Sequence, residues 1–220
     1  MKFPVLAFDL DGTLYPNYRL YARLIPFMVK ENRLLRAMGK ARAHFRETDG
    51  PGGNYYENQA RFMAEILGEP VETVMEKTER LIYRGWEPHF NKIKLFPRVR
   101  ETLEAFRNSG VKLGLLSDFP PEIKLENLNV PEFWDAIVCS ERVGYLKPNS
   151  ASFLELAGKM GTAPEKTLYV GNSVSYDVGG AGRAGMKAAL IRSRWKRRPA
   201  AAGQDFVFYD YRQLCDFVLH

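Results

Sequence analysis

The 220-residue sequence predicts an α/β fold in which a parallel sheet is interrupted, after its first strand, by an all-helical insertion. From residue 98 onward, short apolar runs typical of buried strands alternate with helical patterns, which indicates βα units and a parallel sheet. Between residues 15 and 94 no strand pattern appears. We therefore expect a core domain of residues 1–14 and 95–220 and a helical domain of residues 15–94.

The first predicted strand is the apolar run 6–8, and two carboxylates, Asp9 and Asp11, follow it directly. Gly12 then permits a turn that most residues make only at a cost. Two like charges 4 Å apart repel by roughly 4 kcal/mol at an effective dielectric near 20, so the pair predicts a cation, a shared proton or a reaction at this point. A calcium-binding loop is the alternative, but it would need a Glu where this sequence has Leu20.

The insertion is expected to contain several amphipathic helices separated by loops. The predicted elements are one or two helices over 18–45, a loop over 49–54, a helix over 55–67 stopped by Gly68, and a helix from Pro70 to about Tyr83. Pro26 should kink or interrupt the first helix because it lacks an amide donor. Gly85 is expected to end the last one.

The remainder of the core is expected to alternate between helices and short buried strands. The predicted elements are helices over 98–108, 150–159, 174–185 and 211–219, and strands over 111–116, 136–139, 168–170, 187–191 and 206–208. Three glycines in the helix 174–185, at positions 179, 180 and 182, should allow a neighbouring element to approach closely.

Polar residues follow the predicted strands at four points: Asp9 and Asp11, Ser117 and Asp118, Lys147 in a Lys-Pro-Asn turn, and Asn172 with Ser173 and Asp177. Each pattern alone is common in turns and caps, but their order over about 170 residues is specific. Asp9-Leu10-Asp11-Gly12-Thr13 resembles the first motif of the haloacid dehalogenase-like (HAD) hydrolases. The whole order is similar to the phosphatase branch of that family, which has a Rossmann-like core and a helical cap between the first and second motifs.

This resemblance implies a role for each of these groups. Asp9 would be the nucleophile that forms an aspartyl-phosphate, and Asp11 would be the general acid and then the base for the attacking water. Ser117, Asp118 and Lys147 would bind the phosphate, Ser117 and Lys147 also being catalytic. Three further residues would hold the catalytic groups in place without contacting the phosphate: Thr13, Ser173 and Asp177. Asp177 would hold Lys147 or a metal-bound water.

The implied cofactor is Mg²⁺, with Asp9, the carbonyl of Asp11 and Asn172 as ligands. The family usually has an Asp where this sequence has Asn172. An amide oxygen still coordinates Mg²⁺, but one negative charge is lost, so we expect affinity to fall by about 1–3 kcal/mol.

The resemblance therefore predicts a magnesium-dependent phosphatase acting on a small phosphorylated metabolite. A phosphomutase and a catalytically weak HAD-like binding protein are the alternatives. A dehalogenase is a third, against which the Asp11-Gly12-Thr13 sequence argues.

The charge distribution and the two cysteines bear on nucleic-acid binding, membrane binding, disulfides and metal sites formed by cysteine. The net charge is +6, and residues 15–47 hold eight Lys or Arg and two Glu; a second basic run spans 192–198. No aromatic-interleaved motif accompanies these runs, so a solvated face that attracts anionic substrates is favoured over nucleic-acid or membrane binding.

Cys139 and Cys215 form no metal or disulfide pattern, and no apolar run could span a membrane, which indicates a cytoplasmic protein. A homo-oligomer remains possible.

Overall fold

The computed structural model describes residues 2–48, 50–193 and 203–220. In these ranges a single six-stranded sheet has the order β3-β2-β1-β4-β5-β6, and every pair in it is parallel. The strands are β1 (Val5–Phe8), β2 (Lys112–Ser117), β3 (Ala136–Cys139), β4 (Thr167–Gly171), β5 (Lys187–Ile191) and β6 (Phe206–Phe208). The predicted α/β class with a Rossmann-like parallel sheet is confirmed.

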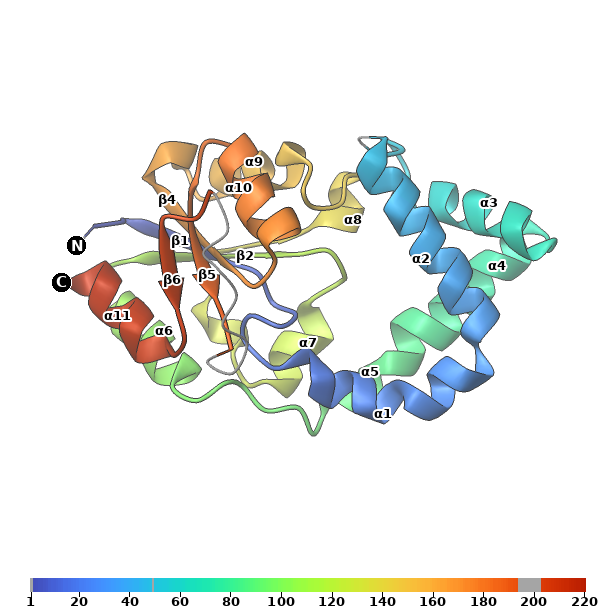
Figure 1. The fold of residues 1–220 in the computed structure, drawn as a ribbon, viewed down its shortest axis with the longest axis horizontal. Coiled ribbons are helices and arrows are strands. Elements are labelled where there is room, and N and C mark those ends of the chain that lie inside the picture. Colours follow the sequence, from blue (N-terminus) through green and yellow to red (C-terminus); the bar gives the residue numbers. More distant parts are fainter. Residues whose placement is uncertain (1, 49, 194–202) are drawn as a thin grey trace.

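Helices cover both faces of this sheet, as Figure 1 shows. One face packs on α6 (Val99–Asn108), α7 (Glu122–Asn127) and α11 (Tyr211–Leu219), and the other on α9 (Ser150–Lys159), η4 (Val174–Val178) and α10 (Gly179–Arg183). Side chains of β1 alternate between the two cores: Leu6 and Phe8 lie in the first and Val5 and Ala7 in the second. The short elements η2 (Pro131–Phe133), α8 (Ser140–Val143) and η3 (Pro164–Lys166) connect these layers.

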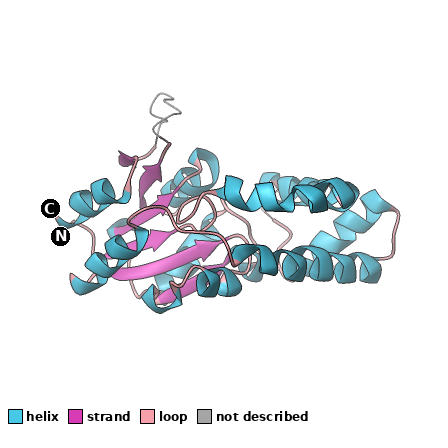
Figure 2. Ribbon diagram, turned by 90° about the horizontal axis from the view of Figure 1, so that it is seen from below, coloured by secondary structure: helices cyan, strands magenta, loops and turns pink. Residues whose placement is uncertain are grey.

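All regular elements that are described between β1 and α6 are helices. They are α1 (Asn17–Lys30), α2 (Asn32–Glu47), α3 (Tyr55–Leu67), α4 (Val71–Thr78), η1 (Glu79–Tyr83) and α5 (Arg84–Phe90). Figures 1 and 2 place them at the end of the core opposite the two chain termini. They enclose a separate apolar cluster, which includes Phe45, Tyr55 and Met63 and is joined by Leu146 from the core. We call this insertion the cap.

One predicted helix end in the cap is wrong. Gly85 lies inside α5, which continues to Phe90 after the π-helical turn η1, so it does not end a helix; Pro26 lies inside α1, which is not interrupted there, and a kink at Pro26 stays a prediction. Tertiary packing accounts for the helix at Gly85, because Ile82 and Phe90 on either side of Gly85 are both buried. The free energy of burying these side chains outweighs the weak helix propensity of glycine, about 1 kcal/mol below alanine.

The core also differs in detail from the prediction. The expected helix over 174–185 is a π-helical turn followed by the short α10, and the helices α7 and α8 were not predicted. Among the three glycines, Gly180 is the one in close contact: a Cβ there would lie 2.4 Å from the Phe153 ring. Residues 194–198 of the second basic run lie outside the described residues. No helix in the described ranges has the length and apolar character needed to cross a bilayer.

Candidate active site

The carboxylate of Asp9 sits at the end of β1, in the middle of the sheet. Its amide donates to the carbonyl of Val170 in β4 at 2.9 Å, which continues the strand pairing up to the site. The residue is 4% exposed; Oδ1 accepts from Lys147 Nζ at 2.6 Å and Oδ2 from Thr13 Oγ1 at 2.7 Å. Burial raises the pKa of Asp9 to about 7, while the charge of Lys147 lowers it. Both carboxylate oxygens are therefore held in place.

Lys147 connects two acids from distant parts of the chain, Asp9 directly after β1 and Asp177 in η4. Besides Asp9, its Nζ donates to Asp177 Oδ1 at 2.8 Å and to the Tyr169 hydroxyl at 3.4 Å. Burial opposes the charge of this ammonium group, but Asp177 and Asp9 hold the pKa of Lys147 well above its usual value. A buried cation thus offsets the negative charge at the end of the sheet.

Asp177 also orders the loop that follows β4. Its Oδ2 accepts the main-chain N–H groups of Asn172 at 3.0 Å and Ser173 at 2.9 Å. The Ser173 hydroxyl accepts from the amide of Tyr176 at 3.1 Å and so caps the turn η4. Asp177 therefore holds Lys147 with one oxygen and the loop with the other.

Asp11 points toward a residue that the sequence interpretation missed. Both of its carboxylate oxygens accept from Lys124 Nζ in α7, at 2.8 and 2.7 Å, and Oδ1 also accepts from the Tyr15 hydroxyl. The ammonium group of Lys124 lies 5.2 Å from the ring centre of Phe90 and 5.3 Å from that of Phe119. Lys124 is thus a buried partner of Asp11, supplied by a helix that was not predicted.

Ser117 ends β2, and Asp118, which follows it, lies beside Lys147. The Ser117 hydroxyl oxygen accepts from the amide of Phe119 at 3.2 Å, which leaves its O–H to donate. Asp118 accepts the main-chain N–H of Lys147 on Oδ1 at 3.0 Å and the guanidinium of Arg46 on Oδ2 at 2.7 Å. Since this carboxylate is fully engaged, a phosphate would meet the Asp118 main chain and not its side chain.

Two arginines of α2 bring the cap against this loop. Arg46 also donates through Nε to the carbonyl of Lys147 at 2.9 Å, and Arg42 forms a buried ion pair with Glu141 and lies 3.5 Å from Asp118 Oδ2. Burial opposes the charge of Asp118, but Lys147, Arg42 and Arg46 lower the pKa of that carboxyl. From the sequence alone, these arginines were expected on a solvated basic face. The missed signal is that Arg42 lies four residues after the buried Met38, on the apolar side of the helix.

The residues predicted to bind a metal offer oxygen atoms of the kind that Mg²⁺ prefers. The side chain of Asn172 reaches the carbonyl of Asp11, to which its Nδ2 donates at 2.8 Å, and Asn17 donates to the same carbonyl at 3.2 Å. The amide of Asn172 lies over Gly12, where a Cβ would be 1.9 Å from it. If the Asn172 side-chain amide is rotated by half a turn, its oxygen takes the place of Nδ2 and lies beside the carbonyl oxygen of Asp11. Together with the Asp9 carboxylate, this donor set fits Mg²⁺.

Comparison with known proteins places this site in a family. A family model described as haloacid dehalogenase-like hydrolase matches residues 3–185. A glyceraldehyde 3-phosphate phosphatase from Methanopyrus kandleri is 31% identical over 201 residues, 85% of this chain and 83% of that protein. A phosphoglycolate phosphatase from Salmonella typhi is 26% identical over 188 residues, 76% of this chain and 73% of that protein.

Solved structures agree with this relationship. A HAD phosphatase from Thermococcus onnurineus is 25% identical, with a TM-score of 0.68 over 100% of this chain and 98% of that one. The L-2-haloacid dehalogenase RSc1362 has a TM-score of 0.68 over the full length of both chains, but at 20% identity this likeness shows the fold alone. The chain belongs to the haloacid dehalogenase-like hydrolases, in the phosphatase branch that its sequence motifs indicated.

Proposed function

We propose that this hydrolase is a magnesium-dependent phosphatase of a small phosphorylated metabolite that reacts through an aspartyl-phosphate on Asp9. The observation that carries the proposal is the buried ammonium group of Lys147, 2.6 Å from Asp9 and 2.8 Å from Asp177. A carboxylate attacks a dianionic phosphate only where positive charge neutralises both. The phosphatase activities named for similar proteins support the same reaction.

In the first step, an oxygen of Asp9 attacks phosphorus, and the bond between phosphorus and the leaving oxygen breaks. Thr13 and Lys147 orient the attacking carboxylate through one oxygen each. The hydroxyl of Ser117 donates to a phosphate oxygen. Asp11 gives a proton to the leaving oxygen and later takes one from the water that cleaves the aspartyl-phosphate.

Mg²⁺ would be held by the Asp9 carboxylate, the Asp11 carbonyl and the side-chain oxygen of Asn172. When bound, it supplies positive charge that reduces the repulsion between Asp9 and the phosphate. Lys124 and Tyr15 hold the Asp11 carboxylate, and so fix the position from which the proton is delivered. A cytoplasmic location and a homo-oligomeric state stay predictions.

The test is phosphate release from p-nitrophenyl phosphate in Mg²⁺ and in EDTA, with Asp9→Asn as the variant. Asp216→Asn, which removes a carboxylate from the exposed face of α11, is the matched control. We expect turnover that needs Mg²⁺, is abolished by Asp9→Asn and is unchanged in the control. Equal turnover in Asp9→Asn would refute the nucleophile. Halide release from a 2-haloacid in EDTA, without phosphate release, would indicate a dehalogenase.

A further inference from the structure

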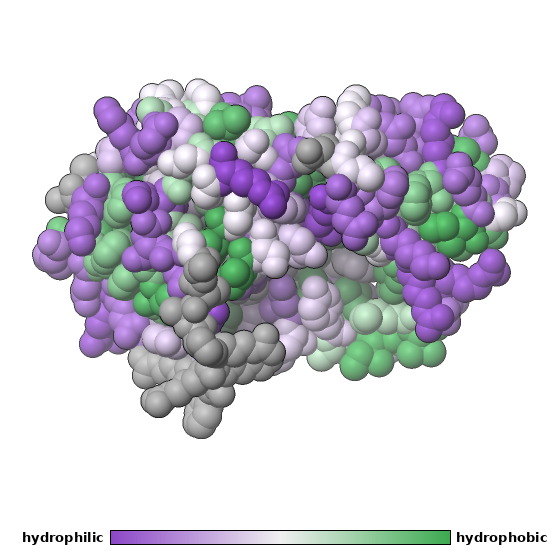
Figure 3. Space-filling model, turned by 45° about the horizontal axis from the view of Figure 1, so that its top comes forward, coloured by the Kyte–Doolittle hydropathy of each residue, from purple (hydrophilic) through white to green (hydrophobic). Residues whose placement is uncertain are grey.

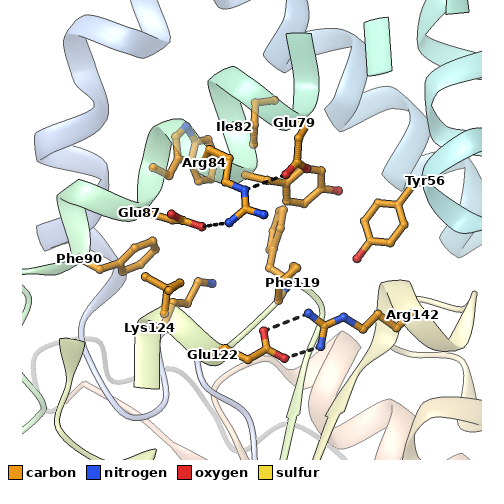
Figure 4. Close-up of a pocket in the computed structure, with 14 residues that line it drawn as sticks. Tyr56, Glu79, Ile82, Arg84, Glu87, Phe90, Phe119, Glu122, Lys124 and Arg142 are labelled. Atoms are coloured by element: carbon orange, nitrogen blue, oxygen red, sulfur yellow. Dashed lines mark hydrogen bonds and ion pairs between the residues drawn. The ribbon is translucent and has the colours of Figure 1, made fainter. Parts of the chain in front are cut away.

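A cavity of about 520 Å³ lies between the cap and the core, next to the site but outside its catalytic groups. Aromatic side chains form much of its wall: Tyr56 from α3, Tyr83 from η1, Trp86 and Phe90 from α5, and Phe119 from the loop after β2. Figure 4 shows Tyr56, Phe90 and Phe119 around this space, and Figure 3 shows a recess between the two lobes. A cavity of this volume accepts a ligand much larger than a two- or three-carbon alcohol.

Two contacts join this cavity to the reacting groups. Lys124 lines it, and the ammonium group of Lys124 is 2.7 Å from the carboxylate of Asp11. Phe119 lines it too, and the amide of Phe119 donates to the hydroxyl oxygen of Ser117. Because Asp11 protonates the leaving oxygen and Ser117 binds the phosphate in the proposed function, the cavity lies where the leaving group would be.

The rings of this wall form a connected set. The ring centre of Phe119 is 6.3 Å from that of Tyr83 and 6.2 Å from that of Trp86, and Tyr56 and Tyr83 are 5.6 Å apart in an edge-to-face pair. Tyr56, Tyr83, Trp86 and Phe119 are each only half-buried, although they are large aromatic residues. The Arg42 guanidinium covers one side of the Phe119 ring, 4.1 Å from its centre, so a flat ligand stacks on the remaining aromatic surface of this concave site.

The charged residues of the wall are all paired with one another or with the site. Arg142 pairs with Glu122, Arg84 pairs with Glu79 and Glu87, and Lys124 pairs with Asp11. Figure 4 shows the first two groups at opposite sides of the cavity. With each cation already paired, the wall offers no uncompensated positive charge to a second anionic group on the substrate. This argues against a carboxylate-bearing leaving group and for a neutral flat one.

We propose that this cavity binds a planar aromatic or heteroaromatic ring, so that the substrate is a phosphate monoester whose leaving alcohol carries such a ring. The inference rests on the proposed function and adds the substrate class to it. Phe119 and Tyr56 are the ring-binding residues, one from the core and one from the cap.

The test compares benzyl phosphate with cyclohexylmethyl phosphate, which are similar in size and both lose a primary alkoxide, but differ in the planarity of the ring. We expect kcat/KM for benzyl phosphate to be about tenfold higher, the scale of one aromatic stacking contact. Phe119→Leu should remove most of this ratio, while Tyr56→Phe, which keeps its ring, should preserve it. The kcat/KM values of a nucleoside 5′-monophosphate and of pyridoxal 5′-phosphate are then compared, to tell whether the cavity prefers a nucleobase or a pyridine ring. 2-Phosphoglycolate is the substrate without a ring in this comparison.

Binding is measured separately, by calorimetric titration of the Asp9→Asn protein with benzylphosphonate and cyclohexylmethylphosphonate. Tenfold tighter binding of benzylphosphonate with no hydrolysis of any phosphate in the wild type would support the ring site and refute the phosphatase. Hydrolysis of acyclic phosphates at equal or higher kcat/KM, with equal binding of the two phosphonates, would refute the ring site and leave the phosphatase intact. A ratio unchanged by a folded Phe119→Leu protein would also overturn the inference.

Discussion

Replacing Asn172 by aspartate should lower the Mg²⁺ concentration at which the enzyme works. In the structure the Asn172 amide donates to the Asp11 carbonyl at 2.8 Å, in the place where the predicted ligand oxygens meet. Asn172→Asp removes this donor and adds a negative charge close to Asp9. The substitution should therefore harm the metal-free protein and help the metal-bound one.

The two effects have different sizes. Without metal, losing one amide hydrogen bond costs about 1 kcal/mol, which lowers Tm by about 2–4 °C in a chain of this length, and repulsion between carboxylates adds to the loss. With metal, a charged contact in place of a neutral one is worth about 1–3 kcal/mol, so the half-saturating Mg²⁺ concentration should fall by about fivefold or more.

The assay follows both phosphate release against Mg²⁺ concentration and Tm in EDTA and in saturating Mg²⁺. Asn172→Ala is the companion variant: it removes the amide without adding charge, so it should raise the half-saturating concentration. A Mg²⁺ dependence that is the same in the wild type and both variants would remove residue 172 from the ligand set. An Asn172→Asp protein that is more stable than the wild type in EDTA would refute the electrostatic reasoning.

Three further predictions concern the surroundings of the site. Lys124→Met should lower kcat at least tenfold for benzyl phosphate, because its leaving alkoxide needs the proton that Asp11 delivers in the proposed reaction. The loss should be much smaller for p-nitrophenyl phosphate, whose leaving group needs no proton. Equal losses of kcat on both substrates would contradict a role of Lys124 in holding Asp11. Burial raises the pKa of Glu141 to about 7, although its ion pair with Arg42 lowers it, so charging this buried group makes the fold less stable as the pH rises from 4.5 to 7. Glu141→Gln should remove this decline, so urea titrations should show the variant gaining stability relative to the wild type between pH 5 and pH 7. Gly180→Ala should destabilise the protein by about 1–3 kcal/mol because its Cβ would meet the ring of Phe153, and an unchanged Tm would show that the ring moves aside freely.

The parallel sheet and the polar groups at its strand ends were predictable because each is encoded locally. The short apolar run 6–8, cut off by two carboxylates and a glycine, predicted the strand that the structure has as Val5–Phe8, and Asp9 and Asp11 then lie beyond its carboxyl end. Three such strand ends, those of β1, β2 and β4, were enough to expect one site; Lys147 was expected at a fourth strand end, but it lies in the loop between α8 and α9. The burial of Asp9 and its contacts with Thr13 and Lys147 follow once β4 lies beside β1.

The residues that sequence reasoning missed act through contacts between distant segments. Lys124 lies 113 positions from Asp11, in a helix of six residues that is too short to show a hydrophobic period. Pro121 followed by Glu122 is a helix-start signal, but it does not tell which side chain would turn toward the site. Arg42 meets Glu141 across 99 positions. Patterns within one element predict the element and its buried side, and only the packed fold shows which elements face each other.

The contacts of α2 make the cap part of the charge balance at the nucleophile. The peptide group of Lys147 is held on both sides, since its N–H donates to Asp118 and its carbonyl accepts from Arg46. Arg46 also binds that same Asp118 carboxylate, and it belongs to the cap. Because the Lys147 ammonium group pairs with Asp9, any displacement of α2 from the core would move the charge on which attack at phosphorus depends in the proposed reaction. The cap therefore supplies a wall of the cavity beside the site and also holds in place the lysine that, in the proposed reaction, lets Asp9 approach a phosphate.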